Sequence, residues 1–125
     1  MSPTQRTIKW LKEQGCLAGI VEKFNPYAGE FGIRQDLFGF IDIVAIAPCV
    51  GIVAVQSCGQ DFSGHIRKLT EERNEAVFEW LKYSPVWLVG WRKVKLKRGG
   101  KALRWAPRIA DFKLVGDDLA YEERK

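Results

Sequence analysis

The feature that most constrains the fold is an apolar run of ten residues, Phe38 to Ala47, with one aspartate inside it. Runs of this kind form strands that are buried on both faces, as in the sheets of α/β proteins. Asp42 interrupts the run, and an ionised carboxylate in a protein core is costly unless a cation compensates it. That cation is either a neighbouring basic side chain or a bound metal ion, and the sequence leaves both open.

Helix and strand signals on both sides of this run indicate a small α/β domain. Ser2, Pro3 and Gln5 supply an N-cap, a first-turn proline and a capping-box glutamine, which predict a helix that ends before Gly15. Strands are predicted over 18–24, 38–47, 52–57, 86–97 and 102–109, and a long helix over 61–83. The order is α-β-β-β-α-β-β, a mixed sheet flanked by two helices.

Turn residues predict how the strands pair. The turn at 48–51 makes strands 38–47 and 52–57 antiparallel neighbours, and Gly99-Gly100 closes a hairpin between the last two strands. We expect one domain over residues 1–115, because a chain of 125 residues has no room for a second. The charged tail, 116–125, is expected to be loosely held.

Several classes of protein are disfavoured by composition. Pro48 and Gly51 break the longest apolar stretch, which argues against a membrane span. Charged residues near the N-terminus argue against a signal peptide, so a cytoplasmic location is expected. Three cysteines without a CxxC pair argue against a disulfide framework and a thiolate zinc site.

One end of the chain is strongly cationic. Nine basic residues and no acidic residue lie between Leu81 and Ala110, although the net charge of the whole chain is only +5. The nine are Lys82, Arg92, Lys93, Lys95, Lys97, Arg98, Lys101, Arg104 and Arg108. Such a segment attracts phosphate backbones, because binding releases condensed counterions. A solvated hairpin with its tryptophans packed beneath is the alternative.

The predicted strand from Val86 alternates in a way that separates two faces. Trp87, Val89, Trp91, Lys93, Lys95 and Lys97 share one face, whereas Val86, Leu88, Gly90, Val94 and Leu96 are expected to face the core, with Arg92 as the exception. Trp91, and Trp105 on the returning strand, are candidates for stacking on unpaired bases.

Two further carboxylates fall near Asp42 in this arrangement. Glu22 lies on the predicted strand 18–24, and Asp36 directly precedes the apolar run. Together with Asp42 they are candidate metal ligands. For each of the two the alternative is a surface ion pair, and Arg34 is the simplest partner for Asp36.

The chain resembles the PD-(D/E)XK nuclease superfamily, especially the archaeal Holliday-junction resolvases and the VRR-NUC nucleases. The resemblance lies in the segment Gly39 to Ala45, the strand Val53 to Ser57 and the helix after that strand. The resemblance covers roughly residues 4–94 and implies a restriction-endonuclease-like fold. In that family a strand aspartate, an acid on the next strand and a lysine two residues further on hold Mg²⁺ or Mn²⁺ and the attacking water. Asp42 matches the aspartate.

The second strand departs from the family pattern. In one register Ala54 takes the acid position and Gln56 the lysine position, and in the other Gln56 takes the acid position and Cys58 the lysine position. Gln56 offers a neutral carbonyl ligand. Glu22 or Asp36 is then expected to supply the missing acid, and Lys68 or His65, on the following helix, the missing cation. A structural role for His65 stays open.

The resemblance implies a metal-dependent nuclease that acts on DNA, with branched or structured DNA favoured, RNA left open and a homodimer expected. The catalytic candidates are Asp42, Gln56, Lys68 and Glu22, and the metal candidates are Asp42, Glu22 and Asp36. The nucleic-acid-binding candidates are Arg34, His65, Trp91, Arg92, Lys93, Lys95, Lys97, Arg98, Lys101 and Arg104. Two alternatives remain: a nuclease-like domain that binds nucleic acid without cutting it, and a module whose basic hairpin binds an acidic protein.

Overall fold

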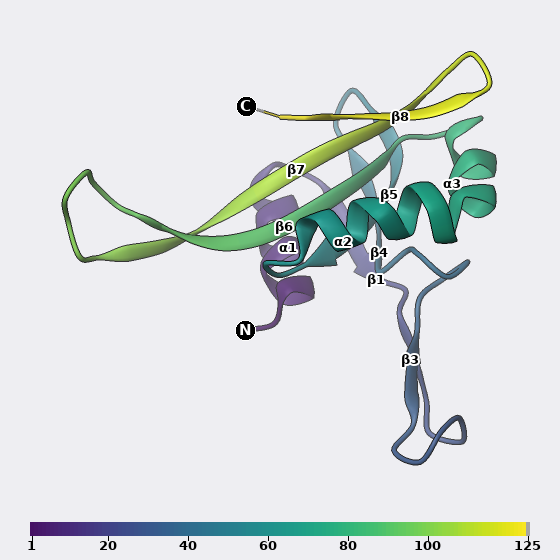
Figure 1. The fold of residues 1–125 in the computed structure, drawn as a ribbon, viewed down its shortest axis with the longest axis horizontal. Coiled ribbons are helices and arrows are strands. Elements are labelled where there is room, and N and C mark those ends of the chain that lie inside the picture. The colour runs from purple at the N-terminus through teal and green to yellow at the C-terminus, as the bar shows by residue number, and fades with distance from the viewer. Residues whose placement is uncertain (125) are drawn as a thin grey trace.

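The computed structural model describes residues 1–124, which form an α/β fold around a six-stranded mixed sheet (Figure 1). The strand order is β1-β4-β5-β6-β7-β8, and β5 and β6 are the parallel pair. The strands are β1 (Leu17–Ile20), β4 (Ile43–Ala47), β5 (Gly51–Cys58), β6 (Val86–Lys95), β7 (Leu103–Val115) and β8 (Asp118–Glu123). The expected α/β class with a mixed sheet is confirmed, and so are the antiparallel pairs β4–β5 and β6–β7.

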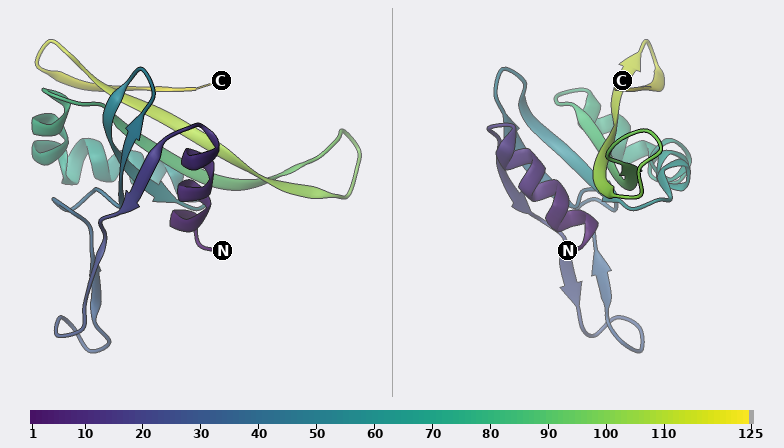
Figure 2. Two further views of the ribbon diagram at one scale, coloured as in Figure 1. Left: turned by 180° about the vertical axis from the view of Figure 1, so that it is seen from behind. Right: turned by 90° about the vertical axis from the view of Figure 1, so that its left-hand side faces the viewer.

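A small hairpin projects from the main sheet (Figures 1 and 2). Its strands are β2 (Lys23–Asn25) and β3 (Ile33–Gln35), which pair antiparallel. The prediction of one continuous strand over 18–24 is therefore wrong. The reason is that β1 pairs with β4 only as far as Ile20, after which the chain leaves the main sheet to pair with β3. Five strands, rather than three, precede the second helical segment.

The first helix follows its sequence signals. It is α1 (Pro3–Glu13), and the Ser2 hydroxyl accepts from the Gln5 amide while the Gln5 side chain accepts from the Ser2 amide, as in a capping box.

Throughout the described chain no helix combines the length and the apolar character that crossing a membrane requires.

The predicted helix over 61–83 is interrupted. It consists of α2 (Phe62–Arg67), a π-helical turn η1 (Lys68–Glu72) and α3 (Asn74–Leu81). The Arg73 amide donates to the Lys68 carbonyl at 2.8 Å, which widens the turn by one residue. The Thr70 hydroxyl also donates to the Ile66 carbonyl, a contact that commonly bends helices.

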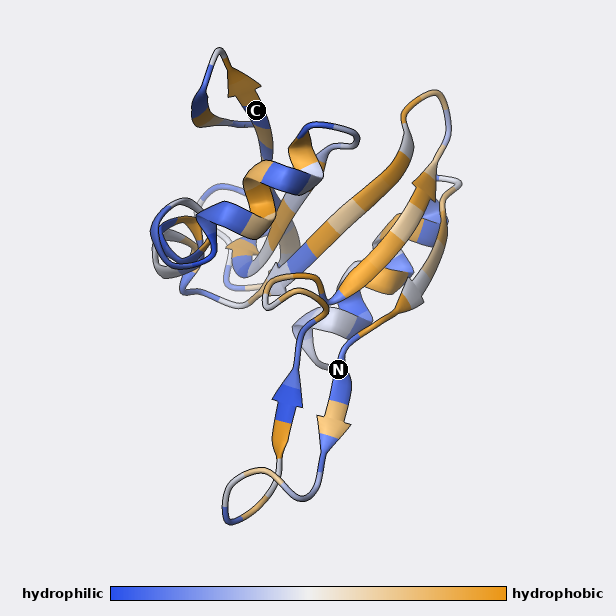
Figure 3. Ribbon diagram, turned by 90° about the vertical axis from the view of Figure 1, so that its right-hand side faces the viewer, coloured by the Kyte–Doolittle hydropathy of each residue, from blue (hydrophilic) through white to orange (hydrophobic). Residues whose placement is uncertain are grey.

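Apolar side chains cover both faces of the central strands. Leu11 of α1 packs with Val55, Val89 and neighbours on one face, and Leu69 and Val77 pack with residues of the other face. Figures 2 and 3 show the largely hydrophobic strands between α1 and the α2–α3 segment. The expectation that only one face of the strand from Val86 meets the core is therefore wrong, because β6 is buried on both faces from Val86 through Trp91.

The C-terminal segment is a strand and not a loose tail. β8 pairs with Ala110–Val115, and the Phe112 and Tyr121 rings stand 5.7 Å apart between their centroids. The Arg124 guanidinium donates to both oxygens of Asp111, at 2.7 and 2.8 Å. The charge of this segment concealed its pairing with β7. Leu119 packs against the core, whereas Glu122 and Glu123 form ion pairs with Lys113 and Arg108 of β7.

Thr7 links α1 to the sheet. Its side chain is fully buried, and its Oγ1 accepts from Ser57 Oγ and from Trp91 Nε1, each at 2.9 Å. The same hydroxyl donates to the Pro3 carbonyl at 2.9 Å. One residue therefore satisfies two buried donors from two different strands.

We expect Thr7→Val to destabilise the fold by about 1–3 kcal/mol, because it leaves the Ser57 and Trp91 donors without an acceptor. Urea unfolding measures this as a lower midpoint at an unchanged slope. Thr70→Val is the matched control, since that hydroxyl only donates to carbonyls of its own helix. Equal losses in the two variants would contradict the role given to Thr7.

Candidate metal centre and nucleic-acid interface

Three carboxylates meet where the β2–β3 hairpin leaves the main sheet. Glu22 follows β1, Asp36 follows β3 and Asp42 precedes β4. One carboxylate oxygen of each lies within 4.8 Å of the others. The three acids that were predicted from the sequence as candidate metal ligands thus lie close together. Strand pairing brings them together, since they are not adjacent along the chain.

A tight turn positions Asp42. Leu37 and Ile41 exchange backbone hydrogen bonds of 3.0 Å around a reversal in which Phe38 and Gly39 have φ angles of 55° and 80°. Glycine adopts this left-handed backbone without steric cost. The predicted strand 38–47 is therefore a strand only from Ile43 onward, because the chain reverses direction at its first residues.

The Asp42 carboxylate is buried, with an exposed fraction of 5%. Its Oδ2 accepts from the Ser57 amide at 2.8 Å, and its backbone amide donates to the Val55 carbonyl. No ion pair among the described residues includes Asp42. The compensation by a neighbouring basic side chain that the sequence left open is thus not found at this carboxylate.

The pKa of Asp42 is raised to about 8, mainly by burial. A hydrogen bond with Asp36 and the negative charges of Asp36 and Glu22 add to the rise, whereas the Ser57 amide opposes it. Crowded carboxylates of this kind hold either a proton or a cation.

Gln56 and Lys68 complete the surroundings of Asp36. Gln56 Nε2 donates to Asp36 Oδ2 at 3.4 Å, and Lys68 Nζ, carried by η1, lies 3.3 Å from the same oxygen. Gln56 is 2% exposed, and its Oε1 is buried and has no hydrogen-bond partner within residues 1–124. A buried carbonyl oxygen without a donor is available to a cation.

The contacts of β5 distinguish its two alternative registers. Gln56 contacts the acids, whereas Ala54 is fully buried in the core beneath the α2–α3 segment. Cys58 is also buried, and burial raises the pKa of its thiol to about 12. The position two residues beyond Gln56 therefore supplies no charge. Two cations reach the cluster from other elements: Lys68, beside Asp36, and Arg34, beside Glu22.

The remaining candidates near the acids have simpler partners. Arg34 Nη1 lies 3.1 Å from Glu22 Oε1, so its partner is Glu22 and not Asp36. His65 Nδ1 lies 2.8 Å from the Asp61 carbonyl, to which it donates. His65 thus bonds within its own helical turn and is not one of the residues clustered with Glu22, Asp36 and Asp42.

The tip of the β6–β7 hairpin, hereafter the basic arm (Arg92–Arg104), extends away from the body of the protein (Figure 1). Its cations are solvent-exposed, and within residues 1–124 none of them forms an ion pair. They are Arg92, Lys93, Lys95, Lys97, Arg98, Lys101 and Arg104. Their charge is uncompensated within the fold and is available to a polyanion.

The two tryptophans near the arm differ in accessibility. Trp91 is only 7% exposed and donates to Thr7, which argues against a free stacking platform there. Trp105 is 39% exposed and lies beneath two cations, with Arg6 at 3.9 Å and Lys93 at 5.2 Å from the ring centroid.

Sequence reasoning did not single out Arg6, Lys9 and Trp10. They lie on α1 at spacings of three and four residues, so they share one helix face, and that face borders Trp91 and Trp105. The spacing was a signal in the sequence, but nothing local showed that two strands would bring tryptophans beside it.

Comparison of the chain with protein-family models, with curated proteins and with solved structures finds no match. The resemblance to the PD-(D/E)XK superfamily therefore stays a prediction. What the site does is inferred from its geometry and its charge.

We expect the stability of the metal-free protein to fall as the pH rises from about 4 to about 8, because Asp42 keeps its proton in the folded state over this range and loses it in the unfolded state. Asp42→Asn is expected to remove this fall and to be more stable than the wild type at pH 8, by on the order of a few kcal/mol.

Urea unfolding in EDTA at several pH values checks this expectation. Asp117→Asn, at an exposed acid in the β7–β8 turn, is the control. Parallel pH profiles for the wild type and Asp42→Asn would contradict it.

Proposed function

We propose that this protein is a metal-dependent nuclease that hydrolyses phosphodiester bonds in DNA. The observation that supports this most directly is the convergence of Glu22, Asp36 and Asp42 beside a buried, unpartnered Gln56 oxygen. A lysine at the cluster and a cationic arm on the same sheet agree with a phosphate substrate.

The donor atoms fit a hard divalent cation. Glu22, Asp36, Asp42 and Gln56 offer only oxygen, which Mg²⁺ and Mn²⁺ prefer, and the buried thiol of Cys58 is not in the group. Burial is the main cause of the raised pKa of Asp42, and the negative charges of Asp36 and Glu22 add to it, so a cation at this point is favoured. When bound, such an ion polarises a phosphate oxygen and lowers the pKa of its water.

The side chains around the acids have separable roles in this proposal. Asp42, fixed by the Ser57 amide, and Glu22 would hold the ion, and Gln56 Oε1 would offer it a neutral oxygen ligand. Lys68 Nζ stays beside Asp36, where it orients the attacking water by donating a hydrogen bond and offsets charge that develops on the phosphate.

An exposed apolar patch on β1, β4 and β5 supports the homodimer that we include in the proposal. Leu17, Ile46 and Ile52 lie opposite one another in register, and their exposed fractions are 72%, 51% and 51%. A contiguous exposed apolar patch marks an interaction surface. A second copy of the chain offers a surface of the same character.

A second candidate is a domain that binds nucleic acid without cutting it. It is favoured by one observation: Lys68 and Gln56 already satisfy the Asp36 carboxylate without an ion. In that case the acids are a vestigial site, and the basic arm carries the function alone.

We expect purified protein to bind Mn²⁺ in calorimetry and to cleave DNA when Mn²⁺ or Mg²⁺ is present. Asp42→Asn is expected to abolish both, because the removed charge is the central one of the cluster. Lys68→Met is expected to lower the cleavage rate at least 100-fold while Mn²⁺ binding persists, since general acid–base and water-positioning groups contribute roughly 10²–10⁴-fold. Lys82→Met, in which the lost lysine pairs with Glu79, is the matched control.

Two outcomes separate the candidates. DNA binding without Mn²⁺ binding and without cleavage would refute the nuclease and favour the non-cutting domain. Cleavage that survives Asp42→Asn would place the active centre elsewhere.

We expect the triple change of Lys93, Lys95 and Lys97 to alanine to weaken DNA binding at low salt. The log–log dependence of affinity on salt should become shallower by up to about 0.9 for each phosphate that the variant no longer neutralises. Anisotropy titrations in EDTA at several salt concentrations measure this. The control is a triple change at Lys12, Lys82 and Lys113, which lie outside the arm, and an equal change of slope there would show that net charge alone matters.

A further inference from the structure

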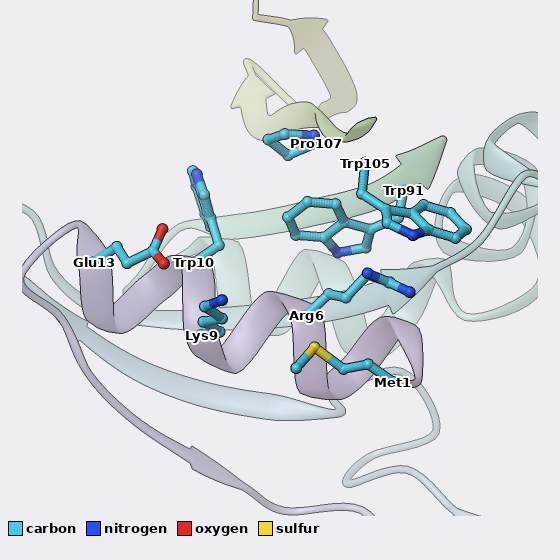
Figure 4. A pocket seen from close by; sticks show the side chains of 8 residues that line it. All are labelled: Met1, Arg6, Lys9, Trp10, Glu13, Trp91, Trp105 and Pro107. Atoms are coloured by element: carbon cyan, nitrogen blue, oxygen red, sulfur yellow. The ribbon is translucent and has the colours of Figure 1, made fainter. Parts of the chain in front are cut away.

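We propose that a pocket between α1 and the root of the basic arm binds one unpaired base of a nucleic-acid strand. The nucleic-acid identity of the ligand rests on the proposed function, but the pocket is separate from the acids. Figure 4 shows Trp10 of α1 on one side of it and Trp91 and Trp105 on the other. Arg6, Lys9 and Glu13 line it from the helix.

The walls are aromatic and held in place. Trp91 is fixed by its hydrogen bond to Thr7, and Trp105 by the cations of Arg6 and Lys93. The cavity has a volume of about 280 Å³, at the small end of ligand pockets. That space suits a single planar ring system with its sugar and is too small for a base pair. The partly exposed indole of Trp105 can stack on bases of any sequence, because every base has a π-face, and the buried Trp91 closes the pocket behind it.

The charge around the pocket selects the class of ligand. Arg6 and Lys9 line it, and Lys93 reaches Trp105 from the arm. A ligand that is aromatic and carries anions on either side meets all of these groups, as a nucleotide within a strand does. Glu13 offers an acceptor for an exocyclic amine of the base.

The pocket lies in line with the arm. Trp105 is the register partner of Lys93, so a phosphate backbone that follows the cations of the arm arrives at the pocket. A fully paired duplex keeps its bases stacked and cannot fill it. A duplex with a single-stranded tail, or a junction with an unpaired nucleotide, can. The inferred substrate class is therefore nucleic acid in which a duplex meets an unpaired strand.

Fluorescence anisotropy in EDTA tests this with three DNAs: a blunt duplex, the same duplex with a thymidine tail, and the same tail built from abasic nucleotides. We expect the thymidine tail to tighten binding roughly 5- to 100-fold and the abasic tail to lose that gain, because the abasic tail keeps the phosphates and lacks the rings. Indole fluorescence should be quenched by the thymidine tail alone.

Trp105→Ala is the main variant, because Trp105 is partly exposed and Trp10 also packs on the core. It should lose the gain from the thymidine tail and keep its affinity for the blunt duplex within about two-fold. Tyr83→Ala, at an aromatic residue 85% exposed and outside the pocket, should keep the gain. Lys9→Ala should weaken tail binding more than Lys12→Ala, since Lys12 lies outside the pocket on the same helix.

Three results would overturn the inference: equal affinity for blunt and tailed duplexes, a full gain from the abasic tail, or displacement of the tail by thymidine monophosphate at concentrations near the dissociation constant of the tail. The last would assign the pocket to free nucleotides. Asp42→Asn should keep the tail preference in EDTA, so a failure of the nuclease proposal and a failure of this one give different results.

Discussion

The hydrogen bond from the Ser57 amide to the buried carboxylate of Asp42 is the interaction on which the candidate centre depends. It fixes the aspartate at the start of β4, against β5, and the projecting hairpin then brings Glu22 and Asp36 to the same point. Arg34 pairs with Glu22 and Lys68 pairs with Asp36, but the buried Asp42 has no basic partner among the described residues. The Asp42 carboxylate is therefore expected to hold either a proton or a divalent ion.

Ser57 serves both faces of the sheet. Its amide holds Asp42, and its hydroxyl donates to Thr7 on α1, which also accepts from Trp91. Because helices cover both faces of the central strands, the carboxylate centre and the tryptophan pocket share one rigid support. Such preorganisation favours a site that holds its groups in place before the substrate arrives.

Charge is divided between two regions of the molecule. The acids collect at the root of the β2–β3 hairpin, and unpaired cations collect on the basic arm. Cations without partners repel one another, so the arm contributes little to folding stability and is free to bind a polyanion. A phosphate backbone on the arm and a divalent ion among the acids complement each other electrostatically.

Local patterns alone determined several features: the capping box of α1, the β4–β5 and β6–β7 pairings, and the choice of Asp42 as a residue to examine. Lys68 was a candidate only because the family resemblance calls for a cation near Asp42. The β2–β3 hairpin, the π turn that carries Lys68 and the strand β8 were decided by tertiary structure. So were the burial of Trp91 and the assignment of Gln56, rather than Ala54, to the acids. Periodicity fixes which side chains share a face of an element, but only packing between distant segments decides what that face meets.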